Sequence, residues 1–134
     1  MDEDTRSIVH IRLAKAKDDV KWARTIFEQG GYRQAISRAY YAVFAIATAT
    51  LLTQRITRKK HSGVESAFHQ FLVKPGLIEP EYGAIYIKAF RERQNADYAD
   101  TTEFTAAKAR QVLEDATRFV ARMEKYLRDA GAIE

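Results

Sequence analysis

The stretch that decides the fold is Ala39-Tyr-Tyr-Ala-Val-Phe-Ala-Ile-Ala-Thr-Ala-Thr-Leu-Leu52, which is apolar on nearly every side of a helix. It forms the larger part of a helix predicted from about Tyr32 to Gln54. A helix that lacks a polar face is buried on most sides. A small bundle cannot easily cover such a helix completely, so we expect part of it to meet a second subunit. The alanines would let neighbouring backbones approach closely.

Outward from this stretch, the apolar spacing stays helical and no segment alternates as a strand does. A helix from about Thr5 to Gln29 is expected first, with Asp19 on its wet side and Gly30-Gly31 at its end. The segment Ser62-x-x-Glu65 has the form of a capping box, which predicts that a third helix starts there. Pro75 ends that helix.

Two further helices complete the prediction. Pro80 suits the first turn of a fourth helix, and Asp100 with Glu103 resembles a capping box that starts the last helix near Thr101. Short connections and matching apolar faces favour an all-α, up-and-down bundle of five helices. Its length of 134 residues fits one domain, residues 1–134.

Composition narrows the class of protein further. The chain has no cysteine, and its histidines, His10, His61 and His69, are scattered, so no metal site or cofactor is expected. The acidic start of the chain does not resemble a signal peptide. The apolar run from Ala39 to Leu52 is shorter than the roughly 20 residues of a membrane span. These features predict a cytoplasmic protein with no membrane partner. The net charge of +4 permits contact with nucleic acid without requiring it.

The segment Arg91-Glu-Arg-Gln-Asn-Ala-Asp-Tyr-Ala-Asp100 is the richest in reactive groups. It holds two arginines, an amide, two carboxylates and a phenol at the end of the predicted fourth helix. A guanidinium can bind phosphate through its planar fork, and a carboxylate can accept a proton. We therefore interpret this segment as the candidate site.

Several stretches together resemble the HEPN domain family (higher eukaryotes and prokaryotes nucleotide-binding). They are Arg38-Ala-Tyr-Tyr-Ala-Val-Phe-Ala-Ile-Ala, Lys59-Lys-His-Ser-Gly-Val, Phe68-His-Gln-Phe and Arg93-Gln-Asn-Ala-Asp-Tyr. The closest match is a small stand-alone bacterial and archaeal branch with an R-x-x-x-D-Y signature. The likeness extends from about Ala14 to Tyr126. It implies a helical bundle that forms a homodimer and a minimal nucleotidyltransferase partner in a toxin–antitoxin arrangement.

The resemblance also implies a chemistry. Many members of the family are metal-independent ribonucleases, whose motif is an arginine followed a few residues later by a histidine. A histidine can take the proton of the 2′-hydroxyl near neutral pH, and an arginine can stabilise charge on the phosphate. Here no histidine follows Arg91 or Arg93 anywhere in the chain, and Tyr98 stands five residues after Arg93. Tyrosine, with a reference pKa near ~10, is a poor base at neutral pH.

The candidate residues can be interpreted in two ways. In the functional interpretation Arg93, Asp97 and Tyr98 are the catalytic candidates, while Arg91, Arg93, Asn95 and His61 bind a nucleotide or phosphate. In the structural interpretation Asp97 accepts an ion pair from Arg93 or from Arg38, a cation at the start of the apolar helix that needs a partner. A structural Arg38–Asp97 pair is our explicit expectation.

Three hypotheses follow for the function. The first is a HEPN-type protein that binds nucleotide or RNA and acts with a nucleotidyltransferase. The second is a metal-independent endoribonuclease toxin with a non-standard motif. The third is a structural interaction module without catalysis.

Overall fold

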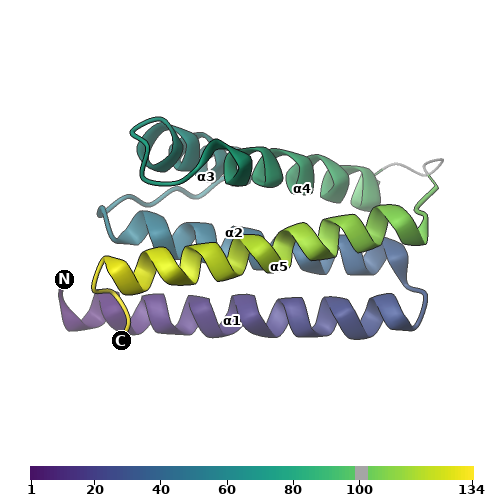
Figure 1. Cartoon of the computed structure of the whole chain (residues 1–134), viewed down its shortest axis with the longest axis horizontal. Helices are drawn as coiled ribbons and strands as arrows, with labels where there is room; N and C mark the ends of the chain where they lie inside the picture. Colours follow the sequence, from purple (N-terminus) through teal and green to yellow (C-terminus); the bar gives the residue numbers. More distant parts are fainter. Residues whose placement is uncertain (99–102) are drawn as a thin grey trace.

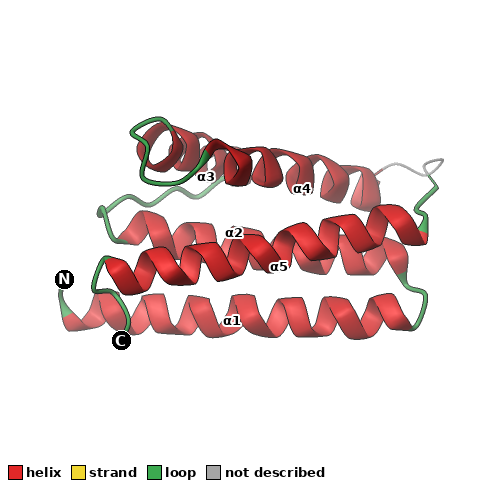
Figure 2. Ribbon diagram, viewed as in Figure 1, coloured by secondary structure: helices red, strands yellow, loops and turns green. Residues whose placement is uncertain are grey.

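The computed structural model describes residues 1–98 and 103–134, and at Tyr98 it describes only the backbone. Within these residues the regular structure is entirely helical, and the all-α prediction is confirmed (Figure 2). The elements are α1 (Glu3–Glu28), α2 (Tyr32–Leu52), α3 (His61–Phe68), a π-helical turn (His69–Val73), α4 (Pro80–Tyr98) and α5 (Ala106–Asp129).

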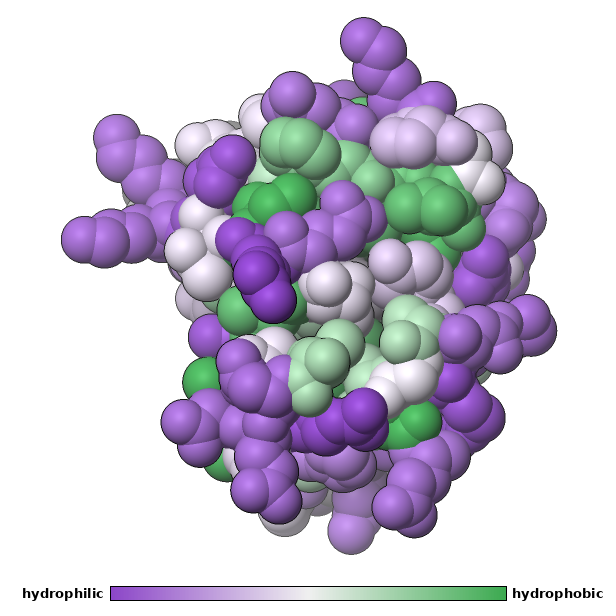
Figure 3. All heavy atoms as spheres, turned by 90° about the vertical axis from the view of Figure 1, so that its left-hand side faces the viewer, coloured by the Kyte–Doolittle hydropathy of each residue, from purple (hydrophilic) through white to green (hydrophobic). Residues whose placement is uncertain are grey.

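The long helices lie side by side in an up-and-down arrangement. α2 packs against α1, α4 and α5, and α5 also contacts α1 and α4. Figure 1 shows α3 nearly end-on, so that it runs across the direction of the long helices, and it shows both termini at the same end of the bundle. On that end, apolar patches are interrupted by hydrophilic side chains (Figure 3).

α2 is the central helix, as its composition predicts. Most of its side chains from Ala35 to Leu51 are buried, and the Tyr40 side chain is completely so. By length and hydropathy the whole of α2 could cross a membrane, although the apolar run within it is short. However, 67% of its most apolar window is buried inside the protein, which is what the core helix of a bundle also shows. Tyr40, Tyr86, Phe68 and Phe119 are the largest fully buried side chains.

The turn between α1 and α2 has the predicted glycine geometry. Gly30 has a φ of 83°, in the left-handed region that glycine enters without a steric penalty. The Gly31 N–H donates to the Ile26 carbonyl at 3.0 Å and the Gly30 N–H donates to the Phe27 carbonyl at 3.0 Å. These two bonds form a Schellman motif. This turn brings α2 back antiparallel along α1.

Two predicted helix starts are wrong, that of α3 by two residues and that of α5 by about five. α3 begins at His61 after Lys60, which makes no side-chain cap, and Ser62 lies inside the helix. α5 begins at Ala106, where the Thr105 hydroxyl accepts from the Lys108 N–H at 3.1 Å. Thr105 has the extended backbone of an N-cap, and its side chain satisfies a donor that the helix itself leaves open. The predicted cap at Asp100 lies outside the described residues.

One residue expected on the wet side of α1 is buried. The Asp19 side chain is only 5% exposed, and it lies 3.0 Å from Lys15 Nζ and 3.4 Å from Arg38 Nη1. The carboxylate therefore sits between α1 and α2 with two cations as partners. Burial of a charge is tolerated when such partners replace its water.

Candidate functional site

Arg93 lies in the last turns of α4 and points toward α2. Its Nη2 donates to the Tyr41 hydroxyl at 2.9 Å, and its Nε lies 2.7 Å from Asp97 Oδ2. The Asp97 carboxylate also accepts from the Ser37 hydroxyl at 2.7 Å. The Arg93 and Asp97 side chains are 14% and 28% exposed. The guanidinium is therefore held in one orientation, close to the surface of the bundle.

Two tyrosine rings complete the surroundings of Arg93. Its guanidinium carbon is 5.4 Å from the centre of the Tyr41 ring and 5.7 Å from that of Tyr40. A cation near the face of an aromatic ring is attracted by the ring's quadrupole. Tyr40 and Tyr41 are neighbours on α2, and their rings meet edge to face at 5.6 Å. We call Arg93, Asp97, Tyr40, Tyr41 and His61 the arginine–histidine cluster.

His61 enters this cluster from the first residue of α3. Its Nδ1 lies 2.7 Å from the Tyr40 hydroxyl, and its ring stacks on Phe44 with 4.1 Å between ring centres. Which of the two atoms in the Tyr40 bond carries the proton depends on the tautomer of the imidazole. Burial, and secondarily the positive charge of Arg93, lower the pKa of His61 below its usual range. The imidazole is therefore neutral at neutral pH, as a proton acceptor must be.

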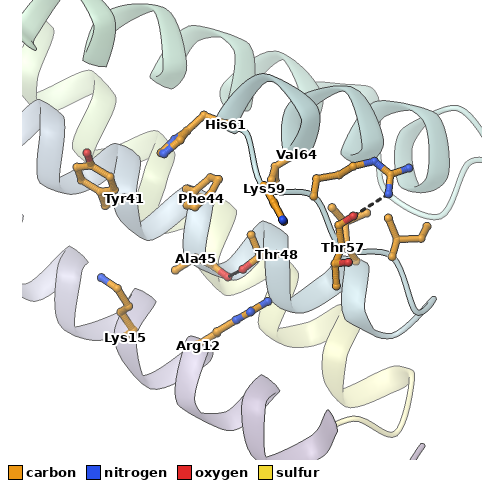
Figure 4. Close-up of a pocket in the computed structure, with 13 residues that line it drawn as sticks. Arg12, Lys15, Tyr41, Phe44, Ala45, Thr48, Thr57, Lys59, His61 and Val64 are labelled. Carbon is orange, nitrogen blue, oxygen red and sulfur yellow. Dashed lines mark hydrogen bonds between the residues drawn. The ribbon is translucent and has the colours of Figure 1, made fainter.

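A cavity of about 530 Å³ opens beside the cluster, between α1, α2 and the connection from α2 to α3. Tyr41 and His61 belong to both the cluster and the cavity (Figure 4). Four cations line it, together with apolar and hydroxyl-bearing side chains. The lining residues are Arg12, Lys15, Tyr41, Phe44, Ala45, Thr48, Leu51, Ile56, Thr57, Arg58, Lys59, His61 and Val64.

The structure corrects the predicted Arg38–Asp97 pair. Arg38 lies against Asp19 of α1, at 3.4 Å, and Asp97 is paired with Arg93 and Ser37 instead. Ser37 and Arg38 are neighbours on a helix, so their side chains point about 100° apart. The Ser37 side chain faces α4 and the Arg38 side chain faces α1. The alternative of an Arg93–Asp97 pair, four residues apart on α4, is the one that forms.

The other candidates are distributed unevenly. Arg93, Asp97 and His61 come together, while Arg91 is exposed and Asn95 is half-buried. Neither Arg91 nor Asn95 makes a side-chain bond to the described residues of the cluster. The Tyr98 side chain lies outside the described residues.

Sequence reasoning missed several contributors. Tyr41, Ser37 and Arg12 are not among the site residues that the sequence predicted. The only signal for Tyr41 and Ser37 was their place on α2 beside Arg38, which could not show that they face α4. Within the described residues, no three side chains of the His, Cys, Asp or Glu type gather as a metal site would require.

These observations define a class of protein. It is an all-α bundle in which an arginine at the end of the fourth helix lies beside two tyrosines, a histidine and a cavity lined by cations. The chain belongs to the HEPN domain family, because the family model for the HEPN domain matches residues 9–126.

Relatives support the same assignment. The chain is 36% identical to a Methanocaldococcus jannaschii protein named "Putative toxin MJ0605", over 96% of both chains. It is 30% identical to a Thermotoga maritima "UPF0332 protein", over 94% of this chain and 96% of the relative. A second M. jannaschii protein, named "Putative toxin MJ0142", is 32% identical over 86% of this chain and 78% of the relative. The chain is thus a HEPN-domain protein that is similar to two proteins named as putative toxins.

Proposed function

We propose that this protein is a cytoplasmic, homodimeric HEPN protein that binds the phosphate of an RNA or nucleotide at the arginine–histidine cluster. We propose further that it acts with a minimal nucleotidyltransferase in a toxin–antitoxin pair. The observation that carries the binding proposal is the convergence of Arg93 and His61 on the adjacent rings of Tyr40 and Tyr41. The names of two relatives support the toxin-like role.

The geometry suits a phosphate contact more than a purely structural pair. The Asp97 carboxylate pairs with Nε of Arg93, and the Tyr41 hydroxyl accepts a hydrogen bond from Nη2. Asp97 and Ser37 hold the arginine in place, and a fixed cation loses little entropy when an anion binds.

A second function, metal-independent RNA cleavage, is favoured by the position of His61. The segment after Arg93 has no histidine, but the fold brings His61 close enough for the charge of Arg93 to lower its pKa. A neutral imidazole can accept the 2′-hydroxyl proton, and Arg93 can stabilise the phosphorane-like charge. In this scheme Asp97 positions Arg93 directly. Tyr98, the third catalytic candidate, has no described side chain.

One experiment separates these functions. The purified protein is incubated with single-stranded RNA in EDTA, alone and with the proposed nucleotidyltransferase partner. The variants are Arg93→Ala and His61→Asn, and Arg128→Ala serves as a matched control because Arg128 is an exposed arginine on α5. RNA cleavage that needs both Arg93 and His61 supports the ribonuclease. RNA binding that needs Arg93, without cleavage, supports the first proposal.

The negative outcomes are equally clear. A protein that neither binds nor cleaves RNA and binds the nucleotidyltransferase with unchanged affinity in every variant is a structural module, and the phosphate proposal fails. The homodimer is tested by light scattering at micromolar concentration, where a monomer mass contradicts it.

A further inference from the structure

The cavity beside the cluster has the dimensions of a ligand site. Its volume of about 530 Å³ lies within the roughly 300–1,000 Å³ typical of small-molecule pockets. Its walls come from α1, α2, the connection between α2 and α3, and the start of α3. Because these elements belong to the packed bundle, the cavity needs no rearrangement to exist.

The charge of the lining is positive. Arg12, Lys15, Arg58 and Lys59 line the cavity, and none of its lining residues, all of which the structure describes, is an aspartate or glutamate. Lys15 is paired with Asp19, and Arg58 donates to the Thr57 carbonyl at 2.7 Å. Two cations thus remain for a ligand.

Those two cations face the same space. Figure 4 shows Arg12 from α1 and Lys59 from the connection pointing toward one another across the cavity. Within residues 1–98 and 103–134, neither side chain forms a hydrogen bond or ion pair with another residue. Arg12 is half-buried, and burial lowers the pKa of its guanidinium, which nevertheless stays charged at neutral pH. Arg12 is partly desolvated and Lys59 is exposed, and two cations that face one space suit an anion with more than one negative charge.

The remaining wall is aromatic and apolar. The rings of Phe44 and His61 stack at 4.1 Å with 12° between their planes, and both line the cavity. Ala45, Leu51, Ile56 and Val64 add apolar surface, and Thr48 and Thr57 add hydroxyl-bearing side chains. Aromatic side chains of this kind stack on planar rings with little dependence on which ring is offered.

We infer that the cavity binds a nucleotide unit, with its own phosphate between Arg12 and Lys59 and its base against the Phe44–His61 pair, while Arg93 of the cluster holds the adjoining phosphate of an RNA. This inference rests on the proposed function, for which it names a ligand pocket next to Arg93. The Tyr41 hydroxyl, which accepts from Arg93, links the cavity wall to the cluster. A free mononucleotide and the 5′-terminal nucleotide of an RNA present the same chemistry.

The test is a calorimetric titration of the whole protein with 5′-AMP, adenosine, inorganic phosphate, and a short RNA with or without a 5′-phosphate. We expect adenosine and phosphate each to bind at least ~10-fold more weakly than 5′-AMP, since each lacks one half of the contacts. Arg12→Met and Lys59→Met should each weaken 5′-AMP binding by ~10-fold or more, the effect of removing a hydrogen bond to a charged group. Lys125→Met, at an exposed lysine of α5, should leave it unchanged.

A further variant, Phe44→Leu, serves as a control for misfolding. Phe44→Leu keeps an apolar side chain but removes the stacking ring, so 5′-AMP affinity should fall toward that of inorganic phosphate while phosphate affinity stays the same. The RNA arms identify the source of the ligand. Tighter binding of the 5′-phosphorylated RNA than of 5′-AMP assigns the pocket to an RNA end, and the reverse assigns it to a free nucleotide.

The results that overturn the inference differ from those that overturn the proposed function. The inferred pocket is wrong if Arg12→Met binds 5′-AMP as tightly as the unmodified protein does. It is also wrong if neither 5′-AMP nor 5′-phosphorylated RNA binds at millimolar concentration. If Arg93→Ala abolishes 5′-AMP binding and Arg12→Met does not, the phosphate binds at the cluster, and the proposed pocket is wrong. Arg12-dependent binding without any RNA or partner interaction keeps the pocket and removes the proposed function.

Discussion

The Tyr40 hydroxyl lies 2.7 Å from His61 Nδ1, which joins the middle of α2 to the first residue of α3. Tyr40 is completely buried, and burial raises the pKa of its phenol far above the usual range. The phenol is therefore neutral at neutral pH, and its hydroxyl fixes one nitrogen of the imidazole. The histidine is thereby oriented by the core and yet lines the cavity.

The pH dependence of stability should show this arrangement. The pKa of His61 is lower in the folded chain than the ~6.5 of an unperturbed histidine. The unfolded state then binds more protons below about pH 6.5, so the free energy of unfolding falls as the pH drops from that value through the lower folded pKa. Because His61 is half-buried, solvent screening should keep this fall below about 1 kcal/mol.

The measurement is the titration of the His61 ring proton by NMR, together with urea unfolding on both sides of this window. In His61→Asn the corresponding part of the pH dependence should disappear, while the exposed His10→Asn variant should retain it. A His61 pKa at or above the value in a short peptide contradicts the interpretation.

Replacing Arg38 with methionine should destabilise the fold through Asp19. The buried carboxylate would keep only Lys15, and the loss should be about 1–2 kcal/mol, since the exposed end of Arg38 lets water replace part of the contact. Urea unfolding of a double-mutant cycle with Asp19→Asn should give a coupling of about 0.5–1 kcal/mol. The same cycle with Asp97→Asn should give none, and strong coupling there would restore the Arg38–Asp97 pair.

Neutralising Asp97 should make Arg93 available to RNA. Asp97→Asn removes the ion pair at Nε and should cost about 1 kcal/mol of stability. It also removes a negative charge beside the phosphate position, so fluorescence anisotropy with labelled single-stranded RNA should show tighter binding and a steeper salt dependence. Ser37→Ala, which loosens Asp97 without changing charge, is the matched control. Weaker RNA binding in Asp97→Asn would contradict this prediction and would mean that the hold of Asp97 on Arg93 matters more for binding than the negative charge that is removed.

Two hydroxyl residues near helix starts should respond differently to truncation. Thr105→Ala removes the cap of α5 and should cost about 1 kcal/mol of stability. Ser62→Ala should change stability by less than about 0.5 kcal/mol, because Ser62 lies inside α3 and the cap position is Lys60. Thermal unfolding of both variants measures the difference, and equal losses would mean that Ser62 caps α3 after all.

The helices and the core could be predicted because their causes are local. The apolar spacing of α1, the glycines after Gln29, Pro80 at the start of α4 and the apolar α2 act over a few residues each. The starts of α3 and α5 were missed for a related reason. Several hydroxyl and carboxyl residues near the start of α5 could cap it, and α3 begins without any side-chain cap, so packing of each helix decides where it starts.

The candidate site was predicted only in part. Arg93, Asp97 and His61 were named, and the structure brings them together, but Tyr41, Ser37 and Arg12 were not recognised as their neighbours. Aromatic residues on an apolar helix are usually core residues, and a cation on a polar helix face is usually solvated. Nothing in the local sequence pattern shows that Tyr41 and Arg12 are exceptions to these two rules.

The amino-acid sequence by itself determined the helical class of this protein and its central helix α2. It also offered Arg93–Asp97 as one of two possible pairs, because contacts three or four residues apart on a helix follow from its repeat alone. Only the tertiary structure decided that Arg38 meets Asp19, that Ser37 meets Asp97 and that His61 reaches Tyr40. These contacts depend on the rotation and offset of one helix against another. Packing of the whole core sets both quantities, and no single segment encodes them.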